Sequence, residues 1–214
     1  MSNNLSPPNG PGRPKDLAKR QAILDAAKKL FVSLGYANTS MDAVATEAGV
    51  SKLTVYSHFN DKETLFSAAV VAKCEEQVPP LFFEWPDGVP IEHVLLNIAR
   101  GFHQLINSDE SVNLHRLIMA LGSQDPQLST IFFEAGPQRM LSGMERLLNK
   151  VNQSGALSID KPRNAAEHFF CLIKGAANFR LLYGCGAPLE AAAAEAHVEE
   201  VVGLFMRAYR PQII

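Results

Sequence analysis

The chain has 214 residues, of which 47% are hydrophobic and 20% are charged, and its formal net charge is −2. These values are ordinary for a soluble globular protein, and the length allows one large domain or two modest ones. No apolar run approaches the roughly 18 residues that a membrane-spanning helix needs. The first residues also lack the basic and apolar regions of a signal peptide. We therefore expect a cytoplasmic protein with no membrane partner.

The cysteines and histidines give little sign of a metal site or a disulfide framework. Cys74, Cys171 and Cys185 are odd in number and form no CxxC pair, so we expect reduced and mostly buried thiols. Three histidines, at positions 93, 103 and 115, are ten and twelve residues apart and have no cluster of carboxylates or thiolates around them. We predict surface or hydrogen-bonded histidines, and neither a metal nor a cofactor.

Charge is unevenly distributed along the chain. Residues 1–62 carry eight Lys and Arg against five acids, a net charge of +3, so the remaining residues carry −5. Such asymmetry favours an N-terminal part that faces nucleic acid and a neutral to acidic remainder.

The predicted elements begin after a polar tail, residues 1–12, that we expect to be disordered. A helix follows Arg13-Pro14-Lys15 and ends at Leu34, with Gly35 as its left-handed C-cap. Two short helices are predicted at about 41–48, capped by Thr39 or Ser40, and at 53–59, capped by Ser51. The spacing Asn60-x-x-Glu63 marks the start of a longer helix, 62–77, which Pro79-Pro80 ends.

Beyond residue 80 the apolar pattern is helical throughout. Candidate helices are 90–107, 110–122, 126–153 with a possible break near Gly136-Pro137, 162–183 and 188–209. The sequence therefore predicts an all-α fold of about nine helices. Its expected parts are a three-helix, homeodomain-like helix-turn-helix domain at 13–62 and an antiparallel helical bundle at 63–214.

The helix-turn-helix prediction depends on residues 41–55. Such a unit needs a small residue where its two helices touch, a glycine that can take positive φ in the turn, and apolar residues on both sides. In this chain all of these requirements are met at once, by Val44, Ala45, Ala48, Gly49, Val50 and Val55.

The same stretch, GYANTSMDAVATEAGVSKLTVYSHFNDKETLF, closely resembles the DNA-binding domain of the tetracycline-repressor (TetR) family. The matching positions are Gly35-Tyr36, Thr39-Ser40, Ala45, Ala48-Gly49-Val50-Ser51, Tyr56, Phe59 and Lys62-Glu63. The resemblance covers about residues 13–77. The C-terminal half is only faintly similar to AefR and AcrR members, mainly over 162–184.

This resemblance implies that the helix beginning near Ser51 lies in the major groove of operator DNA, while Val50, Val55 and Phe59 point inward. Tyr56 either contacts a phosphate or packs across the helix, Lys52 is either a contact or solvated, and Arg13 to Lys15 form either a minor-groove arm or a solubilising tail. The implied DNA-binding residues are Arg13, Lys15, Thr39, Ser40, Ser51, Lys52, Leu53, Thr54, Tyr56, Ser57, His58 and Lys62. Leu53, Ser57 and His58 depart from the residues usual in the family, so the operator sequence does not follow from it.

The family resemblance also implies a homodimer, since helix-turn-helix dimers read two half-sites and this family usually pairs through its last two helices. The predicted interface residues are Phe169, Ile173, Ala176, Arg180, Val198, Val201, Val202 and Phe205. The alternative is that these residues belong to the core.

A ligand pocket is predicted in the middle of the chain, where aromatic and Met side chains are frequent. Soft and adaptable side chains of this kind suit an apolar or aromatic small molecule, although packed core is the alternative for any one of them. The predicted pocket residues are Phe82, Phe83, Trp85, Phe102, Met119, Phe132, Met140 and Met144.

The sequence shows no GxSxG, P-loop, GxGxxG or HExxH motif, so we predict that the protein is not an enzyme. The favoured function is a repressor that releases its operator when a small molecule of unknown identity binds. The alternative is a similar DNA-binding protein without small-molecule control.

Overall fold

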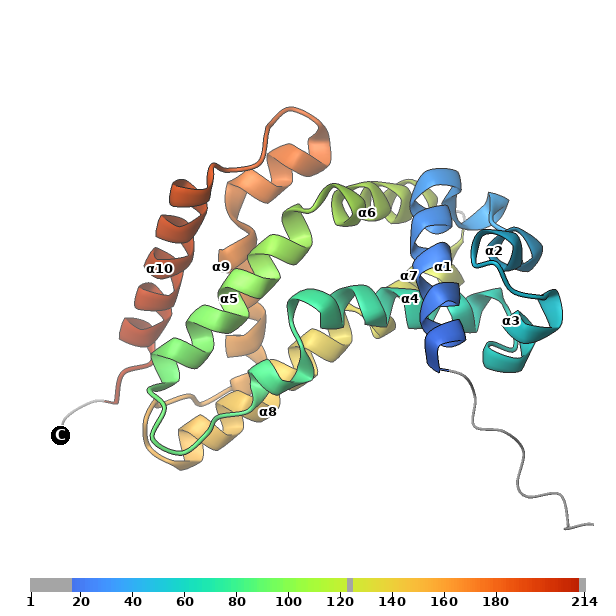
Figure 1. The fold of residues 1–214 in the computed structure, drawn as a ribbon. Coiled ribbons are helices and arrows are strands. Elements are labelled where there is room, and N and C mark those ends of the chain that lie inside the picture. The colour runs from blue at the N-terminus through green and yellow to red at the C-terminus, as the bar shows by residue number, and fades with distance from the viewer. Residues whose placement is uncertain (1–16, 123–124, 212–214) are drawn as a thin grey trace, which may run out of the picture.

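The structure, a computed structural model, describes residues 17–122 and 125–211, and this part of the chain contains helices and turns without a strand. Helices α1 (Leu17–Asn38), α2 (Met41–Glu47) and α3 (Lys52–His58) form one end of the molecule, and α4 (Lys62–Gln77) leads away from them (Figure 1). The tail at 1–12, Arg13 and Lys15 lie outside the described residues. No helix in the described part is long and apolar enough to span a membrane.

The remaining helices form the larger part of the molecule, with α9 (Pro162–Tyr183) and α10 (Ala191–Ala208) at the end opposite α2 and α3 (Figure 1). Along the chain, the elements between α4 and α9 are the 3₁₀ turn η1 (Pro80–Phe83), α5 (Ile91–Asn107), α6 (Asp109–Leu121), α7 (Pro126–Ala135) and α8 (Pro137–Gln153). The all-α prediction is confirmed. The break allowed at Gly136-Pro137 is present, and η1 was not predicted.

Side-chain caps explain where the helices α2, α3 and α4 begin. The side-chain oxygens of Ser40, Ser51 and Asp61 accept hydrogen bonds from backbone N–H groups three residues further on, at the starts of α2, α3 and α4. Each bond satisfies one N–H that has no partner within its helix. Ser40 and Ser51 are among the caps expected from the sequence, and α4 starts at Lys62 as predicted, but its cap is Asp61 where the sequence pattern indicated Asn60.

The end of α1 agrees with the prediction at its glycine and adds one turn. Gly35 takes a positive φ of 79° and a non-helical ψ of 166°, so the helix is interrupted there as expected, and a further helical turn then runs to Asn38. This turn places the Tyr36 ring against Phe31 and Phe66, at centroid distances of 5.8 and 5.2 Å. Aromatic packing of this kind stabilises the added turn.

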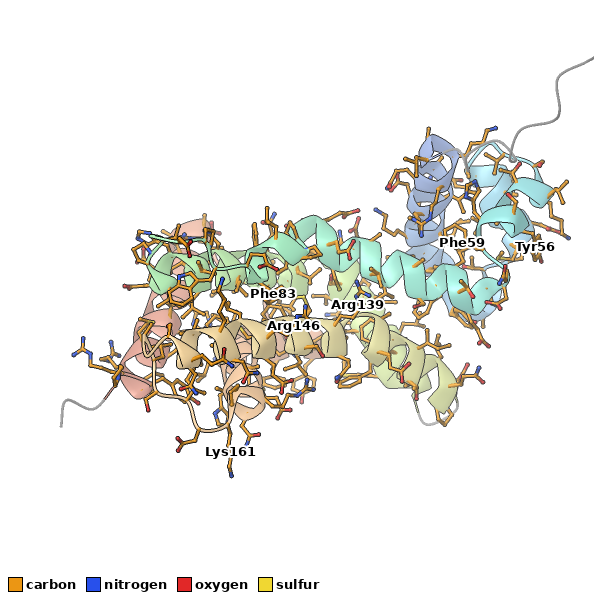
Figure 2. The ribbon with its side chains drawn as sticks, turned by 90° about the horizontal axis from the view of Figure 1, so that it is seen from below. Tyr56, Phe59, Phe83, Arg139, Arg146 and Lys161 are labelled. Atoms are coloured by element: carbon orange, nitrogen blue, oxygen red, sulfur yellow. The ribbon has the colours of Figure 1, made fainter. Side chains whose placement is uncertain are left out.

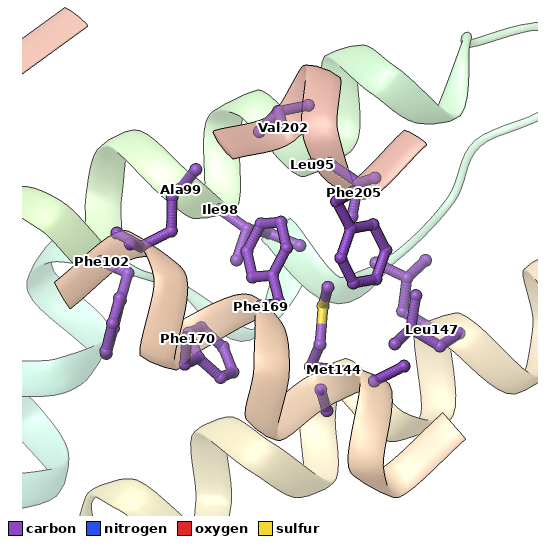
Figure 3. Packing of buried hydrophobic residues seen from close by; sticks show 14 of the residues in the cluster. Leu95, Ile98, Ala99, Phe102, Met144, Leu147, Phe169, Phe170, Val202 and Phe205 are labelled. Atoms are coloured by element: carbon purple, nitrogen blue, oxygen red, sulfur yellow. The ribbon is translucent and has the colours of Figure 1, made fainter. Parts of the chain in front are cut away.

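Two hydrophobic cores hold the fold together. The first joins α1, α2, α3 and the first half of α4, and it also takes Ile118, Leu128, Phe132 and Ala135 from α6 and α7. The second core lies between α5, α8, α9 and α10, around Phe169, Met144 and Phe205 (Figure 3). Since Leu65, Phe66, Ala69 and Val70 of α4 are buried in the first core, that core extends beyond residue 62.

The expectation of mostly buried thiols was wrong. Cys171 and Cys185 are exposed, and only Cys74 is partly buried. Cys74 lies on α4 against the break between α7 and α8, where burial raises the pKa of its thiol to about 11. It is therefore a neutral thiol near pH 7.

Close contact between α5 and the end of α4 depends on Gly101. A Cβ at this position would lie 2.2 Å from the backbone oxygen of Gln77, well inside van der Waals contact. Backbone cannot rotate away as a side chain can, so a larger residue here would force α5 and α4 apart.

We predict that Gly101→Ala lowers the free energy of unfolding by about 1–3 kcal/mol, the usual cost of an overpacked site. Urea denaturation of the purified variant measures the change. Gly203→Ala in α10 is the matched control, because its Cβ would meet only the flexible end of Arg207 at 3.3 Å. Equal stability of the two variants would contradict the proposed backbone contact.

Candidate nucleic-acid interface and internal cavity

Helix α3 has one buried face and one exposed face. Val55 and Phe59 are fully buried in the first core, and Val50 in the preceding turn is half-buried against it. Gly49 takes a φ of 65° in that turn, a conformation that glycine adopts without strain. The inward positions predicted from the sequence are thus confirmed, and they orient the other face of α3 outward.

The outward face of α3 carries residues that can read DNA. Leu53 is 81% exposed and Tyr56 is 41% exposed, and Lys52 and Ser57 are exposed beside them. Thr54 and His58 are half-buried. In Figure 2 Tyr56 lies at the outer edge of the helix-turn-helix end, away from the remainder of the molecule. A short helix with this exposure fits the major groove of B-DNA.

Thr39 does not belong to this surface, which corrects the prediction that its hydroxyl meets a phosphate. Its side chain is 1% exposed, and its Oγ1 donates to the backbone oxygens of Gly35 at 2.8 Å and Leu30 at 3.2 Å. Thr39 therefore ties the end of α1 to the start of α2. Ser40 is exposed, and its hydroxyl oxygen caps α2.

The two lysines predicted to contact DNA have partners within the protein. Lys52 forms an exposed ion pair with Asp42 of α2, 2.8 Å between Nζ and Oδ1, and such a pair is weak enough to exchange for a phosphate. Lys62 is half-buried and donates to the backbone oxygens of Tyr36 at 2.9 Å and Ala37 at 3.4 Å, with its Nζ 4.3 Å from the centre of the Tyr36 ring. These carbonyls at the C-terminal end of α1 supply the negative charge that a cation in the first turn of α4 requires.

A cavity of about 360 Å³, partly open to solvent, lies between α4, α5, α6, α7, α8 and α9. Its apolar wall includes Phe102, Phe132, Phe133, Met140 and Phe170. Volumes from about 300 Å³ upward are typical of small-molecule sites, and a largely apolar lining with a few polar groups is their usual character.

Polar groups lie at a few places in this lining. His115 of α6 donates from Nδ1 to the backbone oxygen of Ser111 at 2.7 Å, and its ring meets Phe132 edge-on. Lys73 and Cys74 come from α4, and Arg163, Glu167 and Lys174 come from α9.

The sequence-based pocket is partly right. Phe102, Phe132 and Met140 do line the cavity, but Met119 is 57% exposed and Met144 is fully buried in the second core. Phe82, Phe83 and Trp85 pack on the outside of that core, so these five residues do not line this cavity, although Phe83 lines a separate pocket beside α8. A high frequency of aromatic and Met residues indicates apolar side chains. It does not distinguish those that line a cavity from those that fill the core. It also missed the polar lining: His115 was predicted as a surface or hydrogen-bonded histidine, and it is hydrogen-bonded, but it was not expected in the cavity.

Comparisons with known proteins agree with this geometry. The family model of bacterial regulatory proteins of the tetR family matches residues 23–69, and the model of the AefR-like transcriptional repressor C-terminal domain matches residues 93–211. The second match alone covers more than half of the chain. The chain belongs to the TetR family of transcriptional regulators. It is therefore a DNA-binding regulator, and the family models and the relatives named below are likewise regulators rather than enzymes.

Several solved structures and curated proteins are similar to this TetR-family chain. A structure from Mesorhizobium loti MAFF303099, described as a TetR-family transcriptional regulator, is 31% identical, with a TM-score of 0.73 over 91% of this chain and 98% of its own. The flavonoid-responsive regulator FrrA is 30% identical, with a TM-score of 0.69 over 92% of this chain and all of its own. The regulator SrpR of Pseudomonas putida is 25% identical over 66% of this chain, and the match spans 64% of SrpR.

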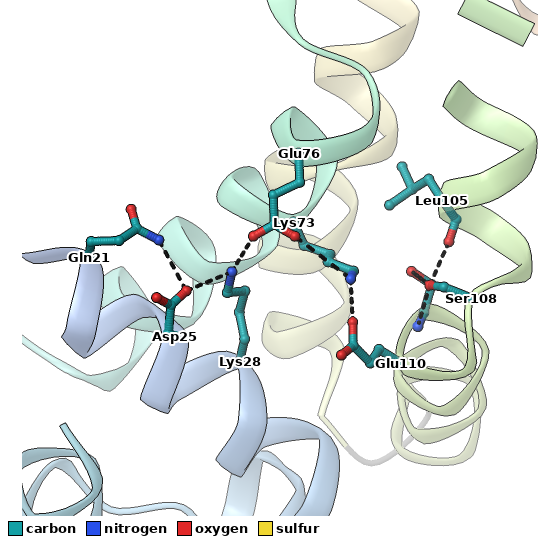
Figure 4. A network of polar contacts seen from close by, with 9 residues as sticks. Gln21, Asp25, Lys28, Lys73, Glu76, Leu105, Ser108 and Glu110 are labelled. Atoms are coloured by element: carbon teal, nitrogen blue, oxygen red, sulfur yellow. Dashed lines mark hydrogen bonds and ion pairs between the residues drawn. The ribbon is translucent and has the colours of Figure 1, made fainter. Parts of the chain in front are cut away.

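A chain of charged side chains connects the cavity to α1 of this regulator (Figure 4). Lys73, a cavity residue, forms ion pairs with Glu110 of α6 and with Glu76 of α4, the latter at 3.8 Å. Glu76 pairs with Lys28 of α1, and Lys28 also pairs with Asp25 at 2.9 Å. Burial alone would lower the pKa of Lys28, but its bonds to Glu76 and Asp25 raise it, so the ammonium stays charged.

The predicted dimer interface needs correction. Phe169, Ile173, Val198, Val201, Val202 and Phe205 are at most 6% exposed, because they fill the second core of a single chain. Of the predicted set only Ala176 and Arg180 are exposed. The large exposed apolar residues of this end are instead Leu172, Phe179 and Tyr183 of α9, Leu189 between α9 and α10, and Leu204 of α10.

Proposed function

We propose that this TetR-family regulator is a repressor that reads its operator with the exposed face of α3 and releases it when an aromatic small molecule fills the cavity. The observation that carries the proposal is that one helix, α4, belongs to both sites. Leu65 and Phe66 fix its first half in the DNA-reading core, and Lys73 and Cys74 of its second half line the cavity.

The lining of the cavity and one relative support an aromatic effector. Four phenylalanine rings lie in the wall, and aromatic rings pack favourably against one another in offset or edge-on arrangements. The flavonoid-responsive FrrA, which matches 92% of this chain, is by its name a regulator that responds to an aromatic class of molecule. An aromatic effector of similar shape is the natural candidate for this chain.

The route between the two sites runs through α4 and its charged contacts. A ligand that moves the second half of α4 displaces Lys73 and Glu76, and Glu76 holds Lys28 of α1. A shift of α4 relative to α6 therefore changes how α1, and with it α3, is oriented. A ligand can drive such a change only as far as its affinities for the two arrangements differ.

Selection from a random pool of double-stranded DNA tests the DNA-reading surface. We predict that the wild-type protein enriches a site with two inverted half-sites, because symmetric helix-turn-helix dimers bind such operators. Leu53→Ala and Ser57→Ala should each change the preferred base at one position per half-site, by about 1 kcal/mol, without altering the salt dependence.

The control for this selection is Leu81→Ala in η1, where an equally exposed leucine, 75% accessible, lies away from α3. That variant should select the wild-type site. If the two α3 variants also select the wild-type site, Leu53 and Ser57 do not read bases.

The effector proposal is tested with flavone, the unsubstituted parent of the flavonoids, added to the complex with the selected operator. We predict that flavone weakens operator affinity at least fivefold in a fluorescence-anisotropy titration, the low end of typical allosteric coupling. Leu141→Trp, which places an indole in the cavity wall, should abolish the response while retaining operator binding. Leu81→Trp at the exposed η1 position serves as control and should respond normally.

If flavone leaves operator affinity of the wild-type protein unchanged, the aromatic-effector proposal fails in this form. A broad panel of further molecules without effect would then favour the alternative, a TetR-family regulator that lacks small-molecule control.

We further infer that the dimer forms through the outer faces of α9 and α10. Ala176, Phe179 and Tyr183 follow the non-helical Gly175 at intervals of three and four residues, so they share one face of the second segment of α9, and Leu172 is exposed on the segment before it. The Phe179 and Tyr183 rings stack at 6.4 Å between centroids and are 52% and 76% exposed. Leu204 adds an exposed side chain on α10. Contiguous exposed apolar surface of this kind marks interaction sites.

We predict that Phe179→Glu and Leu204→Glu each convert the dimer to a monomer at micromolar concentration, since each buries an unpaired charge in an apolar contact. Light scattering coupled to size-exclusion chromatography measures the mass. Met119→Glu on α6, where the side chain is 57% exposed, is the control that should remain dimeric. A dimer that persists in both α9 and α10 variants would place the interface elsewhere.

A further inference from the structure

The cavity lining includes two residues with a nitrogen group for which the described residues provide no hydrogen-bond or ion-pair partner. One is Lys174 of α9, a half-buried residue whose free group is its ammonium. The other is His115 of α6, whose free group is Nε2, since only Nδ1 of that ring is bonded. Both residues line the same cavity, on helices α6 and α9, which pack against each other.

The hydrogen bond of His115 fixes which nitrogen carries its proton. Nδ1 lies 2.7 Å from a carbonyl oxygen, which only accepts, so Nδ1 is the protonated nitrogen. Burial lowers the pKa of His115, the bond to Ser111 raises it, and the Lys174 ammonium lowers it, with a net decrease. The ring is therefore neutral near pH 7, and its Nε2 presents a lone pair that accepts a hydrogen bond.

The other charged groups of the lining already have partners. Lys73 pairs with Glu110 and Glu76, and Arg163 pairs with Glu145 at 3.6 Å and Glu167 at 3.3 Å. These pairs neutralise one another within the protein. A ligand that displaces water from Lys174 and His115 must therefore offer these two groups hydrogen bonds in place of the water.

We propose that the effector is an aromatic molecule whose phenolic hydroxyl lies between His115 and Lys174, a refinement that rests on the proposed effector role of the cavity. The hydroxyl hydrogen is donated to Nε2 of His115, and the oxygen accepts from Nζ of Lys174. A phenol suits this pair because it offers one donor and acceptor lone pairs on a single atom attached to an aromatic ring.

Other polar groups fit the pair less well. A carboxylate accepts a hydrogen bond from Lys174 but has no proton to donate to Nε2 of His115. Its oxygen would therefore face the nitrogen lone pair, and two acceptors repel each other. A plain hydrocarbon satisfies neither group and leaves both desolvated in the apolar cavity. The surrounding phenylalanines, Phe102, Phe132, Phe133 and Phe170, favour a flat aromatic body over an aliphatic alcohol.

The test uses three probes of one shape, 2-naphthol, naphthalene and 2-naphthoate, titrated calorimetrically into the full-length protein. We expect 2-naphthol to bind at least tenfold more tightly than either of the others. Lys174→Met and His115→Phe should each reduce the affinity for 2-naphthol to that for naphthalene, while the affinity for naphthalene stays unchanged. Lys29→Met, on the exposed surface of α1, is the matched control and should keep the full preference.

The outcomes separate this inference from the broader effector proposal. If naphthalene and 2-naphthol bind equally well, or if the preference survives both variants, the hydroxyl site is refuted while the cavity stands as an aromatic site. Tightest binding of 2-naphthoate would replace the phenol with an anion held by the cations of the lining. If none of the three probes binds, the hydroxyl site is overturned. Insensitivity of operator binding to flavone tests the cavity's effector role separately.

Discussion

Helix α4 is packed into both halves of the molecule, and the rest of the structure depends on that arrangement. Its first two turns contribute Leu65, Phe66 and Ala69 to the core that supports α3. Its last turns border the cavity and end against α5, where Gly101 leaves no space for even a methyl group beside Gln77. A packed interface of this kind shifts between discrete arrangements instead of deforming gradually, as a switch requires.

The ion pairs around α4 contribute little to the stability of the fold, and their main effect is on how the helices are oriented. Glu76 and Glu110 are exposed to a large extent, and exposed pairs contribute at most about 1 kcal/mol each. Their role follows from their arrangement in space. The side chains of Lys28, Glu76, Lys73 and Glu110 contact one another in turn and so connect α1, α4 and α6.

Much of the DNA-reading half could be predicted from the sequence, because its signals are local. Capping serines, the glycine turn and the apolar spacing around Val55 are each decided within about four residues. The cavity and the dimer surface depend on which face of a helix meets which neighbour. Phe169 and Phe179 are both apolar residues of α9, yet one is in the core and the other is exposed, and only tertiary packing decides between them. Thr39 was misassigned for the same reason, since its partners lie on α1.

The division of α3 into two faces has a consequence for how such regulators diverge. Val55 and Phe59 carry the contribution of this helix to folding, whereas Leu53 and Ser57 are exposed, and the Ser57 hydroxyl donates within α3 itself, to the backbone oxygen of Thr54 at 2.7 Å. Substitutions at the exposed positions are therefore nearly neutral for stability, since surface changes usually cost less than about 0.5 kcal/mol. If α3 reads the operator as proposed, duplicated copies of the gene can acquire new operators by drift at these positions, while the cavity, built from other helices, is left unchanged.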